Sequence, residues 1–176
     1  MNAQTDLSAL CDRAAQASVT AKATLSANEK AVKELSRDIG AMPFVVRSFV
    51  SSTISAGTGQ DIGGWVKTIS DLTHDIDDAQ DAIESVRLRG SVDQDDRVVL
   101  RATVDHTRGE EAGMERLASF LEAAPGKIRT APPGILPPEK RDEMTAMLDG
   151  HARAVRQGLA ILPALTASLD ALLAAR

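Results

Sequence analysis

The sequence predicts an all-α protein, an elongated four-helix bundle with one additional short helix. Three observations favour this fold class. Apolar residues recur in alternating steps of four and three along four long segments, as on one face of an α-helix. Aromatic residues make up only 2% of the chain, so the aromatic-rich stretches typical of strands are scarce. The segments, of roughly 30 to 38 residues, would form helices of similar length, about 45–57 Å, that can lie side by side.

The last segment, residues 138–175, carries the pattern that the other long segments repeat. Pro163 interrupts it and predicts a kink, because proline removes one backbone hydrogen bond. Residues 1–176 are expected to form a single domain, since the chain is long enough for one substantial core. The apolar stripe of this segment consists of Met144, Leu148, His151, Val155, Gly158, Leu162, Leu165, Leu169 and Leu172.

The first helix is predicted over residues 6–38 and is closed by Gly40. Small residues at Ala14 and Ala21 predict close approach of a neighbouring helix. Asn28 falls on the stripe, where we expect a partly exposed edge position rather than a polar contact that sets the helix register. The stripe consists of Leu7, Cys11, Ala14, Ser18, Ala21, Leu25, Asn28, Val32, Leu35 and Ile39.

The middle of the chain predicts a short helix, a loop and a second long helix. Residues 43–55 are dense in apolar side chains, which fits a short helix or a strand; the helical neighbours favour the helix. A loop rich in Ser, Thr and Gly is expected over 51–64. The second long helix covers residues 60–89, with Trp65 as a core anchor. Its stripe consists of Ile62, Trp65, Ile69, Leu72, Ile76, Ala79, Ile83 and Val86.

The third long helix is predicted over residues 93–124, and two stripes compete for the core. One runs through Val99, Ala102, His106, Gly109, Gly113, Leu117 and Phe120, the other through Leu100, Val104, Thr107, Met114, Ala118 and Leu121. Gly109 and Gly113 destabilise a helix, so each predicts a close helix contact or a bend. Residues 125–138 hold five of the seven prolines. They predict an extended linker that crosses the bundle end or returns along the bundle.

Composition excludes several classes of function. The net charge of −5 is mild and mixed along the chain, so no nucleic-acid partner is expected. Residues 158–175 are long enough to span a membrane but include Pro163 and Asp170, which makes a membrane span unlikely. The lack of an apolar leader and the single cysteine fit a cytoplasmic protein. The excess of Arg over Lys, with much Ala and Asp, suggests a bacterium of high GC content.

The three histidines are the candidates for a metal site. If helices 60–89 and 93–124 pair antiparallel, His74 and His106 lie at similar heights, and His151 is expected within a turn or two of them. Only one acid-x-x-His pair of the di-iron pattern is present, so the sequence predicts no metal and no cofactor. Three unrelated histidines are the competing interpretation. The candidate ligands are His74, Asp71, Asp78, His106, Glu110 and His151.

No catalytic arrangement is recognisable. Cys11 lies on an apolar stripe, where burial is favoured over reactivity. Gly57-Thr58-Gly59 lacks the lysine and the strands of a phosphate-binding loop. One face of residues 60–89 is acidic and is a candidate for binding a basic partner, with an ordinary solvated surface as the alternative. Its candidate residues are Asp71, Asp75, Asp78 and Asp81.

We therefore expect a non-enzymatic protein that acts by binding other proteins, as an adaptor, a chaperone-like partner or an oligomeric scaffold. Self-association is included, as a homodimer through the first or last helix. One alternative is a ligand- or metal-sensing bundle with its occupant near His106, His151 and the Gly109/Gly113 gap. Another is a protein that associates with a lipid or granule surface by opening its amphipathic helices.

Overall fold

A computed structural model describes residues 3–130 and 137–175, which fold into five helices and no strands. The predicted all-α class and the four long helices with one short helix are thereby confirmed. Helix boundaries fall within a few residues of the predicted ones, except that the short helix and the helix predicted over 93–124 both continue beyond their predicted ends. The helices are α1 (Ala3–Gly40), α2 (Phe44–Thr58), α3 (Ile62–Arg89), α4 (Gln94–Arg129) and α5 (Pro138–Leu173).

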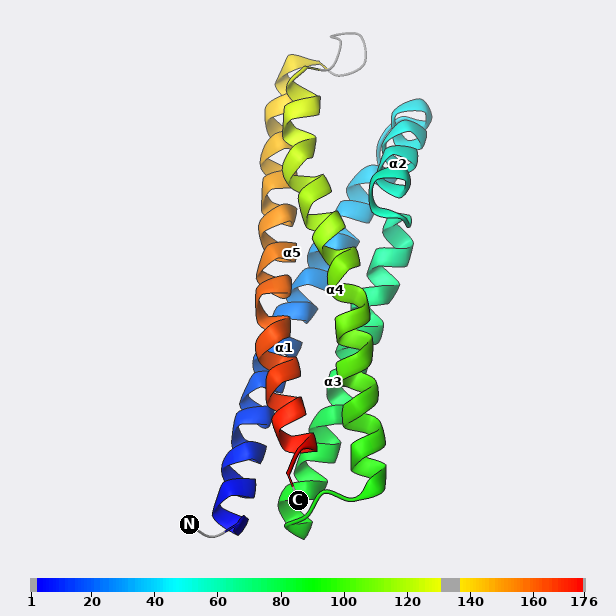
Figure 1. Cartoon of the computed structure of the whole chain (residues 1–176). Coiled ribbons are helices and arrows are strands. Elements are labelled where there is room, and N and C mark those ends of the chain that lie inside the picture. The colour runs from blue at the N-terminus through cyan, green and yellow to red at the C-terminus, as the bar shows by residue number, and fades with distance from the viewer. Residues whose placement is uncertain (1–2, 131–136, 176) are drawn as a thin grey trace.

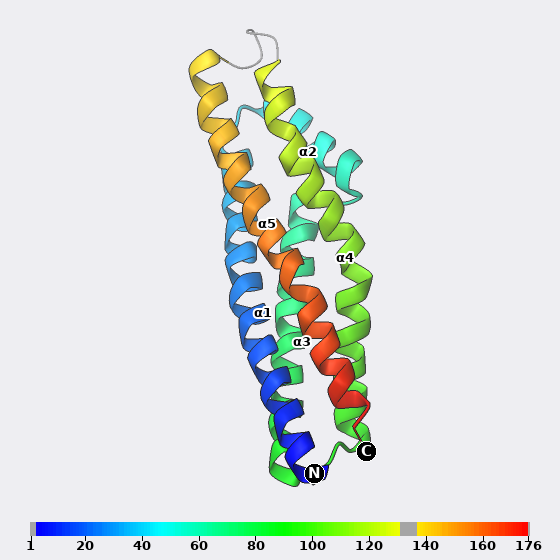
Figure 2. The same ribbon diagram turned by 60° about the vertical axis from the view of Figure 1, so that its left-hand side comes forward.

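The long helices run up, down, up and down around one core (Figures 1 and 2). Two ion pairs define the register of α1 against α3: Asp12 pairs with Arg87, and Lys22 pairs with Asp77. Between α4 and α5, Arg156 pairs with Glu122, and Arg108 pairs with Asp170. Contacts of α3 with α4 and of α5 with α1 close the ring of four. Every neighbouring pair is thus antiparallel.

The short helix α2 lies at the end of the bundle where α1 ends and α3 begins (Figure 2). Pro43 precedes it, and Gly59 ends it with φ 90°, a left-handed conformation that glycine adopts without strain. Asp61 then caps α3, because its side chain accepts a hydrogen bond of 2.7 Å from the Gly64 amide. Two backbone breaks thus let α2 lean away from the axis of α3, and its main packing partner is α4.

The predicted stripes form the core. The stripes of α1, α3 and α5 are buried, except that Leu7, Ile62 and Met144 are partly exposed at the margin of the core. On α4 the second of the competing stripes, from Leu100 to Leu121, is buried throughout, whereas Ala102 and Gly109 of the first are exposed. The described helices include none that is both long and apolar enough to cross a bilayer.

The predicted linker 125–138 begins too early. Helix α4 continues to Arg129, with Pro125 buried inside it. Leu121, Pro125 and Ile128 extend the four-three spacing onto the core, so packing outweighs the one backbone hydrogen bond that proline removes. The Arg141 guanidinium donates to the Arg129 carbonyl at 3.3 Å, which ties the start of α5 to the end of α4. The predicted crossing or return of the linker falls on residues 131–136, which lie outside the described part of the chain.

Three further expectations need correction. The predicted loop over 51–64 is helical as far as Thr58, because hydroxyls such as those of Thr53 and Thr58 donate to carbonyls four residues earlier and are satisfied within the helix. Asn28 is 1% exposed and not at an edge. Gly113 does make a close contact, since a Cβ there would lie 2.9 Å from the Trp65 ring, but Gly109 faces open space.

Candidate functional site

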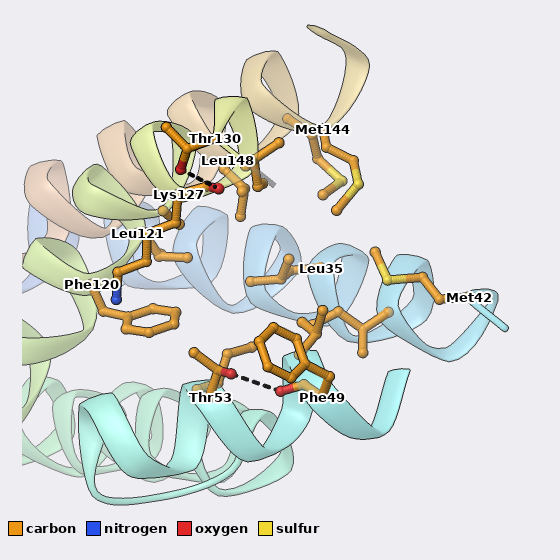
Figure 3. Close-up of a pocket in the computed structure, with 16 residues that line it drawn as sticks. Leu35, Met42, Phe49, Thr53, Phe120, Leu121, Lys127, Thr130, Met144 and Leu148 are labelled. Atoms are coloured by element: carbon orange, nitrogen blue, oxygen red, sulfur yellow. Dashed lines mark hydrogen bonds between the residues drawn. The ribbon is translucent and has the colours of Figure 1, made fainter. Parts of the chain in front are cut away.

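An apolar cavity of about 380 Å³ lies beneath α2, and we call it the α2 groove (Figure 3). Phe49 of α2 and Met144 of α5 stand on opposite sides of it, and Leu35 of α1 lies between them. All helices but α3 contribute. The lining residues are Leu35, Ile39, Met42, Phe49, Val50, Thr53, Ile54, Phe120, Leu121, Ala124, Lys127, Ile128, Thr130, Met144, Met147 and Leu148.

The groove exists because α2 is only partly packed. Ile54 is buried against the core, but three large apolar side chains of the same helix are not. Phe44, Val45 and Phe49 are 73%, 77% and 68% exposed. Phe49 is the one of these three that also lines the cavity. Single exposed apolar residues are ordinary, whereas an exposed apolar side chain beside an apolar cavity is typical of an interaction surface.

Three of the methionines line the groove, at Met42, Met144 and Met147. Methionine side chains are unbranched and polarisable, so they adapt to apolar partners of different shapes. Met114, by contrast, is fully buried in the core. These three methionine side chains can therefore rearrange around an occupant, while Met114 stays in the core.

Polar groups in the groove are few and mostly satisfied. The hydroxyls of Thr53 and Thr130 donate to the carbonyls of Phe49 and Gly126. Among the described residues that line the groove, Lys127 is the only charged one, and its ammonium lies 5.9 Å from the centre of the Phe120 ring. It forms no ion pair with any carboxylate in the described part of the chain. The groove thus combines an apolar interior with one unpaired cation.

The candidate metal ligands are not brought together. His74 is exposed, although it lies level with His106 as expected. His106 contacts Asp75 through Nδ1, and its Nε2 lies 3.9 Å from Glu110. On the register set by the α4–α5 ion pairs, His151 is level with residues near Ala124, roughly 27 Å along α4 from His106. Residues 3–130 and 137–175 contain no group of three or more His, Cys, Asp or Glu side chains placed to hold a metal ion.

His151 is instead a buried core residue. Its side chain is in the core and its Nε2 has no hydrogen-bond partner. Burial lowers the pKa of the imidazole from its ordinary 6.5, and the nearby charges of Asp38 and Glu34 oppose this only in part. The folded state therefore disfavours the charged imidazole.

A pH dependence of stability follows. Above about pH 6.5 the imidazole is neutral whether the chain is folded or unfolded; below that pH the unfolded chain takes up the proton first, so the free energy of unfolding falls. In His151→Leu this decline between about pH 6.5 and 5 should be smaller than in the wild type. Urea unfolding at several pH values measures the difference. Parallel pH profiles for the two proteins would contradict the assignment.

The acidic face of α3 is partly neutralised by neighbouring charges. Asp71 pairs with Lys67, and Asp75 contacts His106. Asp78 and Asp81 are exposed and form no ion pair with other described residues. Exposed and without an ion pair among the described residues, these positions resemble a solvated helix face. Their binding of a basic partner stays a prediction.

The remaining sequence candidates have structural roles. Cys11 is fully buried, and burial raises the pKa of its thiol, which disfavours the reactive thiolate. Gly59 ends α2, and Gly64 offers its amide to the capping Asp61. The groove itself was missed by sequence reasoning. Its signal in the sequence is the density of apolar residues over 43–55, from which only a short helix was predicted.

Comparisons of this chain with protein-family models, curated proteins and solved structures give no match.

Proposed function

We propose that this protein is a non-enzymatic binding protein whose α2 groove receives an amphipathic helix of a protein partner. The observation that carries the proposal is the open, methionine-lined cavity with the exposed Phe49 of α2 at its edge. An amphipathic helix places anchors at intervals of three and four residues along one face and buries them in such a groove. Adaptor and chaperone-like roles both require binding of this kind.

The groove suits a helix because other helices already form its floor and walls. At this end of the bundle, residues of α1, α4 and α5 line the groove on the sides that α2 leaves open (Figure 3). An added helix would cover Phe49 and contact Met144 and Met147, and the apolar surface removed from water would drive binding. The flexible methionines would accommodate partners that differ in sequence.

The other hypotheses receive less support. The ligand site expected near His106, His151 and the Gly109/Gly113 gap receives less support, because Trp65 fills the space beside Gly113. The stripes of α1 and α5 are buried within one chain, so they leave no apolar seam for the predicted homodimer. Self-association through the groove is therefore treated as an outcome of the test below. A cytoplasmic location and a bacterial source stay predictions.

A photo-crosslinking experiment tests the proposal. A photoreactive amino acid is placed at Phe49 or Met147 in the groove, and at Val19 or Val98 as exposed apolar controls far from it. We expect both groove positions to capture the same protein through the same helical segment, and the controls not to capture it. A synthetic peptide of that segment should bind the purified chain one to one and gain helicity.

A matched pair of variants localises the binding. Ala124→Phe fills the groove from α4, whereas Ala123→Phe places the same ring on the exposed face of that helix. The peptide should lose affinity only for Ala124→Phe. Equal capture at groove and control positions, or peptide binding that ignores Ala124→Phe, would contradict the proposal. Capture of a second copy of this chain would replace the partner by self-association.

A further inference from the structure

We infer that the α2 groove also binds a free fatty carboxylate, with the alkyl chain in the cavity and the carboxylate at Lys127. This small-molecule site does not depend on the proposed protein partner. It would make occupation of the groove by a partner sensitive to such amphiphiles, because both occupants cover the same residues.

The interior of the groove matches an alkyl chain. Its volume of about 380 Å³ is within the range of small-molecule sites, and hydrocarbon side chains and methionines line nearly all of it. The two lining hydroxyls already donate within their own helices. A polar ligand would therefore lose its hydrogen bonds to water without replacement, whereas an alkyl chain has none to lose.

Lys127 determines the head group. It is the only charged residue among the described ones that line the groove, it comes from the last turn of α4, and no described carboxylate pairs with it. Its ammonium lies 5.9 Å from the centre of the ring of Phe120, which also lines the groove, and the Lys127 side chain is exposed (Figure 3). A chain with one anionic end can place that end at the ammonium and the rest in the apolar interior. A cationic amphiphile of the same length would bring a like charge to Lys127 instead.

Calorimetric titration of the full chain with three probes of equal chain length tests this inference. The probes are dodecanoate, dodecanol and dodecyltrimethylammonium, each kept below its aggregation concentration. We expect dodecanoate to bind one to one. Dodecanol should bind up to about fivefold more weakly, as the loss of one exposed ion pair implies, and the cation more weakly still.

Two substitutions test separately how much the Lys127 charge and the apolar cavity contribute to binding. Lys127→Met keeps the apolar stem but removes the ammonium, so dodecanoate affinity should fall to that of dodecanol while dodecanol affinity stays unchanged. Ala124→Phe should weaken both probes and Ala123→Phe neither. Circular dichroism shows whether Ala124→Phe folds. If it does not, Val50→Phe, which fills the cavity from α2, replaces it in this test.

The outcomes distinguish the parts of the inference. Equal affinity for dodecanoate and dodecanol, unaffected by Lys127→Met, would overturn recognition of the carboxylate. Failure of all three probes to bind, or binding insensitive to both cavity-filling variants, would overturn the site. Binding to anionic phospholipid vesicles without binding of dodecanoate would replace the free ligand by a membrane surface. None of these results bears on whether a partner helix binds.

Discussion

Trp65→Ala is expected to lower the free energy of unfolding by about 3–5 kcal/mol, as large-to-small changes of buried aromatic residues do. Trp65 is 1% exposed, and its ring packs against Gly113 of α4. Its Nε1 donates to Thr58 Oγ1 at 2.9 Å. One side chain thus joins α3 to α4 and to the end of α2, and truncation would leave a cavity where these three helices meet. Urea unfolding followed by far-ultraviolet circular dichroism measures the loss.

Trp65→Phe is the matched control for this prediction. It keeps an aromatic ring but removes the hydrogen bond to Thr58, so the expected loss is smaller, about 1–2 kcal/mol. A cost below about 1 kcal/mol for Trp65→Ala would mean that the ring is not buried between these helices.

The second large effect concerns the contact of α1 with α5. A Cβ at Gly158 would lie 1.8 Å from Nδ2 and 3.0 Å from Cγ of Asn28, and the Asn28 side chain is buried with no hydrogen-bond partner for Nδ2. We expect Gly158→Ala to destabilise the protein by about 1–3 kcal/mol through overpacking, despite the gain of roughly 1 kcal/mol in helix propensity.

A double-mutant cycle isolates this contact. Asn28→Ala makes room for the added methyl group, so Gly158→Ala should cost much less in that background, with a coupling of about 0.5–3 kcal/mol. Urea unfolding of the two single variants and the double variant gives the coupling. Simple addition of the two single effects would show that the side chains do not touch.

Much of the fold was predictable because apolar periodicity identifies which face of a helix is buried. The stripes of α1, α3 and α5 were correct almost residue by residue, including the polar His151 and the small Gly158. On α4, periodicity alone did not decide between two stripes, since both are apolar enough; the packing of α3 and α5 against α4 selects the one that begins at Leu100.

The errors arose where local preference and tertiary packing disagree. From the sequence, Pro125 predicts the end of a helix, yet in the structure its ring continues the buried stripe of α4. From the sequence, Asn28 is predicted at an edge because burial of an amide is unfavourable. In the structure, Gly158 has no side chain and leaves space for the Asn28 amide. The two positions are 130 residues apart, so no local pattern connects them.

The groove was beyond the reach of sequence reasoning for a similar reason. Apolar residues on α2 predict a face that avoids water, but they do not show whether the chain has another element to cover that face. Here α2 is short, lies between two backbone breaks, and leaves Phe44, Val45 and Phe49 uncovered. The sequence therefore identifies the apolar residues of α2, but only the arrangement of the helices shows that they are exposed.

The central claim is that the α2 groove is open to an occupant while the bundle core is closed. Methyl NMR of methionine-labelled protein with a dissolved neutral nitroxide tests it directly, because the nitroxide speeds the relaxation of methyl groups that it can approach. We predict strong effects at Met42, Met144 and Met147 and none at Met114, which is 0% exposed. Equal protection of all four methyl groups would contradict the account.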